Sequence, residues 1–98
     1  MKTVMKINKN DNVAIALHSI KKGDKFKIED NILKVNENID FGHKIALTNI
    51  AKDTNVIKYG EVIGYATQEI KTGDWVHMHN LYSNRGHLKG EVKNSNEV

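Results

Sequence analysis

The segment "IKKGDKF" at residues 20–26 decides the fold, because its pattern returns as "IAKDTNV" at residues 50–56 and "IKTGDWV" at residues 70–76. Each copy has an apolar residue, two mostly polar residues, a Gly-Asp or Asp-Thr pair, a variable residue and a second apolar residue. Glycine takes positive φ freely, and Asp or Thr side chains hydrogen-bond nearby amides. The pattern predicts three similar tight corners, each ending one strand and starting the next. Their irregular spacing argues against a solenoid.

Between the corners, apolar residues recur at every second position, as Val13, Ile15 and Leu17 do. Period two is typical of short strands, and no long window carries a helical stripe. We expect an all-β domain of short, bent hairpins over residues 1–82. Residues 83–98 are polar, which predicts a C-terminal tail that is ordered only in part or only against a partner.

Composition narrows the classes of function. The chain has 98 residues, enough for one small domain with a thin core, and no cysteine, which excludes disulfides and thiolate metal sites. Its net charge of +3 comes from scattered lysines, and aromatic residues make up 6%. This fits a small anionic ligand better than nucleic acid. No apolar stretch reaches the length of a signal peptide or membrane span, so we expect a cytoplasmic protein without a membrane partner.

The segment "GDWVHMHN" at residues 73–80 holds two histidines around one methionine. If it is a strand, His77 and His79 share one face about 7 Å apart, while Val76 and Met78 carry core contacts on the other. Two imidazoles can bind a transition metal or hold a carboxylate, but a complete metal site needs further ligands that no local spacing supplies. The alternative is a pair of surface histidines at a strand end.

The segment "GHK" at residues 42–44 is a second candidate site. Gly42 allows a turn or a close approach to a ligand, and His43 and Lys44 could donate a proton or neutralise a carboxylate. A hairpin turn followed by two exposed polar residues is the alternative.

A third candidate lies in "KYGEVIG", residues 58–64. Tyr59 could hydrogen-bond a substrate hydroxyl, whereas Gly60 and Gly64 most simply serve a tight turn and a close strand contact. Asp11 and Asn12, which open an early strand, are typical turn formers.

Four motifs together resemble one family. They are "DNVAIAL", "GHKIAL", "IKYGEVIGYAT" and "GDWVHMHN", at residues 11–17, 42–47, 57–67 and 73–80. Their order and separation are similar to those of the amino-terminal SAF domain of altronate and galactarate dehydratases, which has a β-clip fold. The resemblance covers roughly residues 11–82 and lacks the large carboxy-terminal domain of those enzymes. The chain therefore looks like a free-standing small subunit, such as that of sulfolactate sulfo-lyase.

This resemblance implies the small subunit of a hydro-lyase that completes a site held mainly by a dehydratase large subunit. It implies a sugar-acid substrate, a divalent metal, usually iron, located mainly in the large subunit, and catalytic roles for His43 and Lys44. The substrate-binding residues that it implies are Tyr59, His77, His79 and Asn80, and His77 and His79 are the metal candidates. A stand-alone SAF module that binds an anionic carbohydrate and a sulfolactate sulfo-lyase subunit stay open as alternatives, as does a homo-oligomer.

Overall fold

The computed structural model describes residues 2–84, which form nine short β-strands in three antiparallel sheets. The strands are β1 (Val4–Met5), β2 (Val13–Ala16), β3 (Lys25–Ile28), β4 (Asn31–Lys34), β5 (Lys44–Ala46), β6 (Asn55–Lys58), β7 (Glu61–Ala66), β8 (Trp75–Val76) and β9 (Leu81–Ser83). The predicted all-β, SAF-like β-clip domain of short, bent hairpins is confirmed. Strand β9 runs to Ser83, the first residue of the predicted tail, and residues 85–98 of that tail lie outside the described residues.

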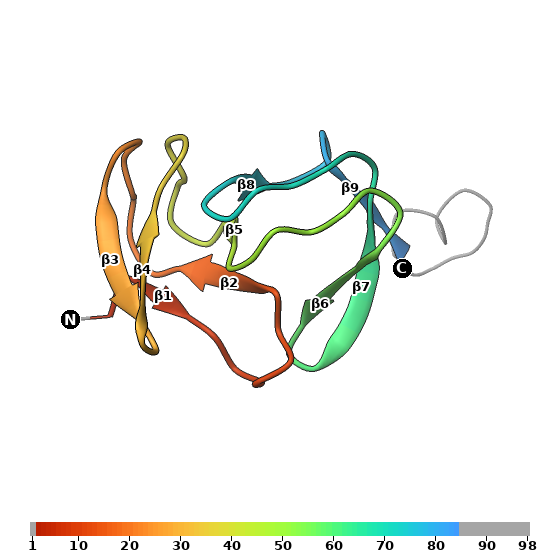
Figure 1. Ribbon diagram of the computed structural model, residues 1–98, viewed down its shortest axis with the longest axis horizontal. Coiled ribbons are helices and arrows are strands. Elements are labelled where there is room, and N and C mark those ends of the chain that lie inside the picture. The colour runs from red at the N-terminus through yellow and green to blue at the C-terminus, as the bar shows by residue number, and fades with distance from the viewer. Residues whose placement is uncertain (1, 85–98) are drawn as a thin grey trace.

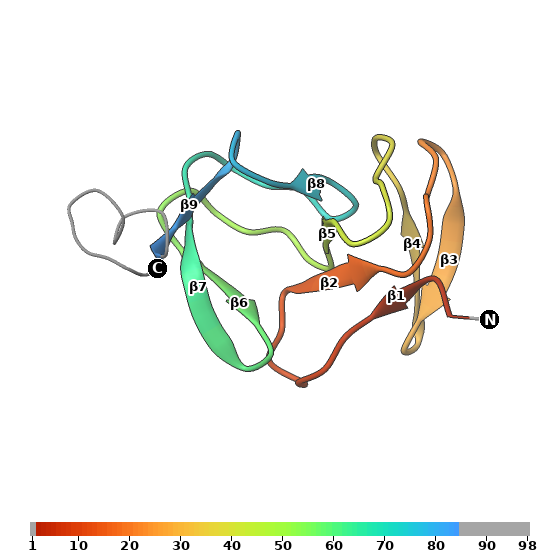
Figure 2. The same cartoon turned by 180° about the vertical axis from the view of Figure 1, so that it is seen from behind.

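A central sheet with the order β1-β2-β5-β8 joins two smaller sheets. The β3–β4 hairpin lies at one end of the molecule and the β6-β7-β9 sheet at the other, as both views show (Figures 1 and 2). Every pairing between these strands is antiparallel, which suits a chain that turns back on itself at short corners.

The interior consists of two apolar clusters, one in each half. Strand β2 lies between the two clusters. Because successive side chains of a strand point to opposite faces, Ala14 packs in the first cluster and Val13 in the second. Both are essentially inaccessible to solvent, whereas Ile15 is only half-buried. The predicted strand is present, but its burial does not follow the alternation of apolar residues, because Ala14 and Ala16 are buried while Ile15 and Leu17 are half-buried.

The three predicted corners are present and are closed in a common way. We call the residue after the Gly or Asp of each corner the turn-closing residue. In these three corners its side chain hydrogen-bonds to a backbone group near the start of the same corner. Asp24 Oδ2 accepts the N–H of Lys21 (3.0 Å), and Asp74 Oδ2 accepts that of Lys71 (2.8 Å). In the middle corner Thr54 Oγ1 donates to a backbone carbonyl oxygen instead (2.7 Å).

Residues 39–45 form a fourth corner, so the hairpin turn considered as an alternative at "GHK" is present and belongs to the same pattern as the three predicted corners. Gly42 has φ of +85°, close to the +93° of Gly23, and the N–H of His43 donates to the carbonyl oxygen of Asp40 at 3.0 Å. His43 is the turn-closing residue here. Because histidine replaces the Asp or Thr of the other corners, the segment was not recognised from the sequence as a further copy of the repeat.

The four corners face each other in pairs. Ile20 bridges to Ile39 in the first half and Ile50 to Ile70 in the second, and all four isoleucines are buried. Each half therefore repeats one arrangement, in which two corners enclose a pair of isoleucines at the centre of one apolar cluster.

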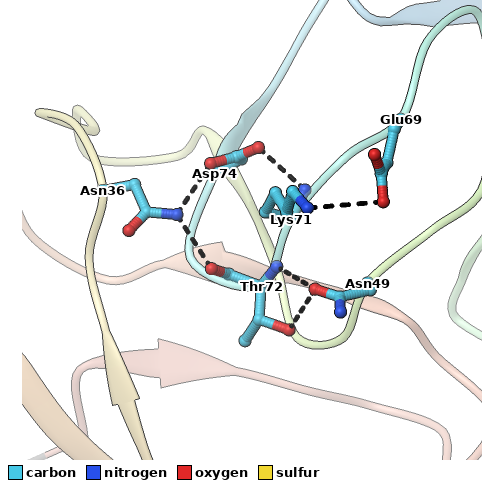
Figure 3. A network of polar contacts seen from close by, with 6 residues as sticks. All are labelled: Asn36, Asn49, Glu69, Lys71, Thr72 and Asp74. Atoms are coloured by element: carbon cyan, nitrogen blue, oxygen red, sulfur yellow. Dashed lines mark hydrogen bonds and ion pairs between the residues drawn. The ribbon is translucent and has the colours of Figure 1, made fainter.

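The corner at residues 70–76 is fixed by polar contacts with both halves (Figure 3). Asn36 Nδ2 donates to Thr72 O at 2.9 Å and to Asp74 Oδ1 at 2.8 Å. From the other side, Asn49 Oδ1 accepts the backbone N–H of Thr72 at 2.9 Å. Since this corner leads directly into β8, the network also fixes the start of the "GDWVHMHN" segment.

Gly73 and Gly23 offer a matched test of this packing. Both have φ of +93°, but a Cβ at Gly73 would meet the carbonyl oxygen of Lys34, whereas a Cβ at Gly23 would meet nothing. We expect Gly23→Ala to cost about 1–2 kcal/mol for the left-handed backbone alone. Gly73→Ala should cost about 2–5 kcal/mol, because overpacking adds roughly 1–3 kcal/mol. Thermal unfolding of the two variants measures the difference, and equal melting temperatures would contradict the close approach at Gly73.

Candidate functional site

Three histidines gather around one tryptophan at the junction of β5 and β8, and we call them the histidine–tryptophan cluster. The ring centroids of Trp75 and His77 are 5.0 Å apart, those of Trp75 and His79 5.1 Å, and those of His43 and His77 5.4 Å. Strand pairing creates this proximity, because Ile45 lies opposite Trp75 and Lys44 opposite Val76. Residues about 30 positions apart in the sequence thus share one surface, and two of the three candidate segments meet there.

The segment after β8 is a turn, so the expected strand over residues 75–81 is wrong beyond Val76. The side chain of Asn80 closes the turn: its Oδ1 accepts the N–H of His77 (2.9 Å), and its Nδ2 donates to the carbonyl oxygen of Trp75 (2.9 Å). Asparagine side chains compete with strand pairing in this way. Met78 is 80% exposed and carries no core contacts, in contrast to the fully buried Val76.

Both histidines contact Trp75 from this turn, and their convergence on one ligand stays a prediction. Asn80 is 3% exposed, and both of its side-chain polar atoms bond within its own turn. The structure thus gives Asn80 a turn-forming role, and its substrate-binding role stays a prediction.

The side chain of His43 does not bond to its own corner but reaches across to β8. Trp75 Nε1 donates a hydrogen bond to His43 Nδ1 at 3.1 Å, and the ring centroids are 5.6 Å apart. His43 is therefore fixed by the cluster, whereas the side chain of every other turn-closing residue bonds to the backbone of its own corner.

A groove of about 760 Å³ lies beside the cluster. It brings together three residues predicted for the site, Lys44, Tyr59 and His77, which come from three separate motifs. The other lining residues are Lys58, Glu61, Val62, Ile63, Met78, Leu81, Ser83 and Asn84. Its wall is thus partly apolar and partly charged, with two lysines and one glutamate, so positive charge is in excess, as it would be in a site for a small anion.

Burial and positive neighbours set the charges in the groove. Burial lowers the pKa of Lys44, and the charge of Lys58 lowers it further. Burial also lowers the pKa of His77, helped by His43, Lys44 and His79. His77 is therefore neutral at neutral pH and can accept a hydrogen bond, while Lys44 supplies a positive charge beside it.

Lys58 is a groove residue that sequence reasoning missed. Its Nζ lies 4.9 Å from the centroid of the Tyr59 ring, and neither Lys58 nor Lys44 has a carboxylate within 4 Å among residues 2–84. An anion in the groove would meet two cations, with the carboxylate of Glu61 in the same wall but in no ion pair with either lysine. The position of Lys58, directly before Tyr59 in the motif "KYGEVIG", was the signal that could have identified it.

The turn that carries Tyr59 is held by Asp11. Burial by itself would raise the pKa of Asp11, but the backbone N–H groups of Asn8 (3.0 Å), Gly60 (2.7 Å), Tyr59 and Ile7 together hold it below its ordinary value. A carboxylate that accepts several N–H bonds strongly prefers its charged form. The predicted turn-forming role of Asp11 is confirmed, and the contact fixes the far wall of the groove.

The side chain of Asn12 also holds this wall of the groove, through two hydrogen bonds to the backbone. Its Oδ1 accepts the N–H of Ile57 at 2.7 Å, and its Nδ2 donates to the carbonyl oxygen of Asn55 at 3.0 Å. Both partners belong to β6, which ends at Lys58. Gly64 is structural as predicted, since a Cβ there would meet the carbonyl oxygen of Tyr82 on β9.

The metal candidates make at most a partial ligand set. Within residues 2–84, no group of three or more His, Asp or Glu side chains lies close enough together to hold a metal ion. His77 and His79 fit a metal only if further ligands come from outside this part of the chain.

No helix within residues 2–84 is long and apolar enough to cross a membrane.

Comparison with known proteins finds one family. A sequence model of the altronate/galactarate dehydratase SAF domain matches residues 2–84. Altronate dehydratase of Bacillus subtilis (strain 168) is 42% identical over 84 residues, and that of Escherichia coli (strain K12) 43% identical over 84 residues. In both cases the match covers 86% of this chain but only 17% of the relative. The (2R)-sulfolactate sulfo-lyase subunit alpha of Chromohalobacter salexigens is 42% identical over 52 residues, which are 53% of this chain and 55% of the relative.

Proposed function

Because the chain belongs to the altronate/galactarate dehydratase SAF domain family, we propose that it is the small subunit of a sugar-acid dehydratase and completes an active site held mainly by a separate large chain. The observation that carries this proposal is the meeting of Lys44, Tyr59 and His77 in one groove beside His43. We place the assembly in the cytoplasm on the strength of its enzymatic relatives.

The need for a large chain follows from what the reaction requires. Removal of water from a sugar acid takes a base for the proton next to the carboxylate, a cation for the resulting enediolate, and an acid for the departing hydroxide. The groove and the cluster beside it supply cations and imidazoles. Residues 2–84, however, contain no group of three or more His, Asp or Glu side chains that could hold a metal ion. The relative from C. salexigens is named as a subunit, which supports a free-standing form.

Each groove residue has a role that fits its surroundings. Lys44 and Lys58 hold the carboxylate of the substrate, because neither forms an ion pair with a carboxylate among residues 2–84. Neutral His77 and Tyr59 hydrogen-bond the hydroxyls of the substrate, and His43 donates a hydrogen bond to the departing hydroxyl. A divalent metal, iron in our proposal, would be bound mainly by the large chain, where it would polarise substrate oxygens, with His77 and His79 facing it.

Two alternatives use the same groove. A sulfonate is an anion of similar size to a carboxylate, so the likeness to a sulfolactate sulfo-lyase subunit favours a sulfonated hydroxy acid as the second candidate substrate. A stand-alone module that binds an anionic carbohydrate without chemistry is favoured by the groove lying within a single chain.

Affinity purification from the native host tests the proposal. We expect the tagged chain to retain a large protein related to the part of altronate dehydratase that this chain does not match, identified by mass spectrometry. A chain that purifies alone, or only as copies of itself, and binds galactarate or altronate in calorimetry would contradict the subunit role and support the binding module.

A further inference from the structure

We infer that Trp75 is a positioning residue that fixes the tautomer of His43, leaving the single proton of the neutral imidazole on Nε2. His43 then meets a ligand as an N–H donor with a defined orientation. The identity of that ligand rests on the proposed function, whereas the hydrogen bond and the tautomer do not.

The geometry of the contact leaves one assignment. Trp75 Nε1 lies 3.1 Å from His43 Nδ1, within hydrogen-bond distance. An indole nitrogen only donates, so His43 Nδ1 must accept and carries no proton. A neutral imidazole has one N–H, which is therefore on Nε2.

His43 is available for this contact because of its place in the fold. It is the turn-closing residue of its corner, and at the three equivalent positions the side chain is bound to the backbone of its own corner. At the corner of residues 39–45 no such bond to the side chain forms, and the imidazole instead crosses to β8. This exchange of a local turn contact for a contact between strands indicates that His43 has a function beyond the turn.

Trp75 is itself held in place on several sides. Its backbone N–H donates to Glu37 Oε2 at 3.1 Å, and its carbonyl oxygen accepts from Asn80 Nδ2 at 2.9 Å. His77 and His79 contact its indole ring. The donor is thus rigid, and a rigid donor imposes one orientation on His43.

This arrangement has a chemical consequence. With Nδ1 occupied by the indole and Nε2 protonated, neutral His43 offers no lone pair to a metal and serves as a donor to a ligand oxygen. His77, which stacks against it, lines the groove, so the donor is placed at the edge of the space that a substrate would fill. His43 and His77 thereby differ in role, one as donor and the other as acceptor.

Nitrogen-15 NMR of the full chain, at a pH where imidazoles are neutral, tests the inference. We expect a scalar coupling between Trp75 Nε1 and His43 Nδ1 across the hydrogen bond, and the chemical shift of an unprotonated nitrogen for Nδ1. Trp75→Phe keeps an aromatic ring but removes the donor, so the coupling should vanish and protonated Nδ1 should become populated. His79→Gln is the matched control, because it removes a ring from Trp75 without removing the donor and should leave both signals unchanged.

A protonated Nδ1 in the natural protein, or a Nδ1 shift that Trp75→Phe leaves unchanged, would overturn the inference. Neither result bears on whether a large chain binds. In an assembled enzyme, Trp75→Phe should lower kcat more than it changes KM, and this split would separate orientation of a reacting group from ordinary binding. Loss of the NMR signature and loss of assembly are therefore distinguishable outcomes.

Discussion

Replacing Val76 with aspartate is expected to unfold the domain and to abolish binding of the large chain at the same time. Val76 is fully buried in the second apolar cluster, beside β5, which carries Lys44. Burying even a neutral polar group without a partner costs roughly 2–7 kcal/mol, and an unpaired charge costs more. Since small domains are stable by only about 5–15 kcal/mol, one such change suffices.

Met78→Asp is the matched control, two residues away in the same segment. Because Met78 is 80% exposed, its replacement should shift the free energy of unfolding by no more than about 0.5 kcal/mol. Circular dichroism on heating compares the two variants. If Met78→Asp unfolds the domain as Val76→Asp does, the segment after Val76 is a strand and the turn closed by Asn80 is wrong.

Replacing His43 with glutamine is expected to lower the turnover of the assembled enzyme by a factor of about 100 to 1,000. Losses of this size accompany removal of one well-placed hydrogen-bond donor from an active site. The fold should survive, because His43 is only half-buried and its backbone contacts close the corner without the side chain. Steady-state kinetics of the assembled enzyme measure the change in kcat.

His18→Gln is the control for a histidine outside the cluster. His18 is exposed, and its Nδ1 lies 3.0 Å from the carbonyl oxygen of Ser19. Its replacement should leave turnover within a factor of about 2, as expected of a surface change. A His43→Gln enzyme with the same kcat as the His18→Gln enzyme would remove His43 from the catalytic roles proposed above.

The fold was predictable to the extent that it depends on local chemistry. Gly-Asp pairs at residues 23–24 and 73–74 identify corners because few residues tolerate positive φ, and period-two apolar residues identify strands. The fourth corner was considered only as a hairpin turn and not as a copy of the repeat, because His43 replaces the usual turn-closing Asp or Thr. The turn after β8 was missed because "VHMHN" alternates like a strand, and only the three-dimensional contacts of Asn80 distinguish the two.

The candidate site was predictable only in part, for a different physical reason. His43 and His77 were identified by residue type, but their stacking depends on the register between β5 and β8, which a single sequence does not reveal. Lys58 and Trp75 were missed on the same ground. Lys58 acquires significance from the groove that it shares with Lys44, and Trp75 from the position of its indole nitrogen beside His43.

Reconstitution from separately purified chains tests the central claim most directly. Turnover of altronate, galactarate and sulfolactate is measured for this chain alone, for the metal-loaded large chain alone, and for the mixture. We predict no useful turnover by either chain alone and a strong gain on mixing. The concentration of this chain that gives half-maximal activity should equal the one that half-saturates the large chain in a binding measurement. Turnover by this chain alone, free of contaminating large chain, or full activity of the large chain without it, would contradict the claim that the small chain completes the active site.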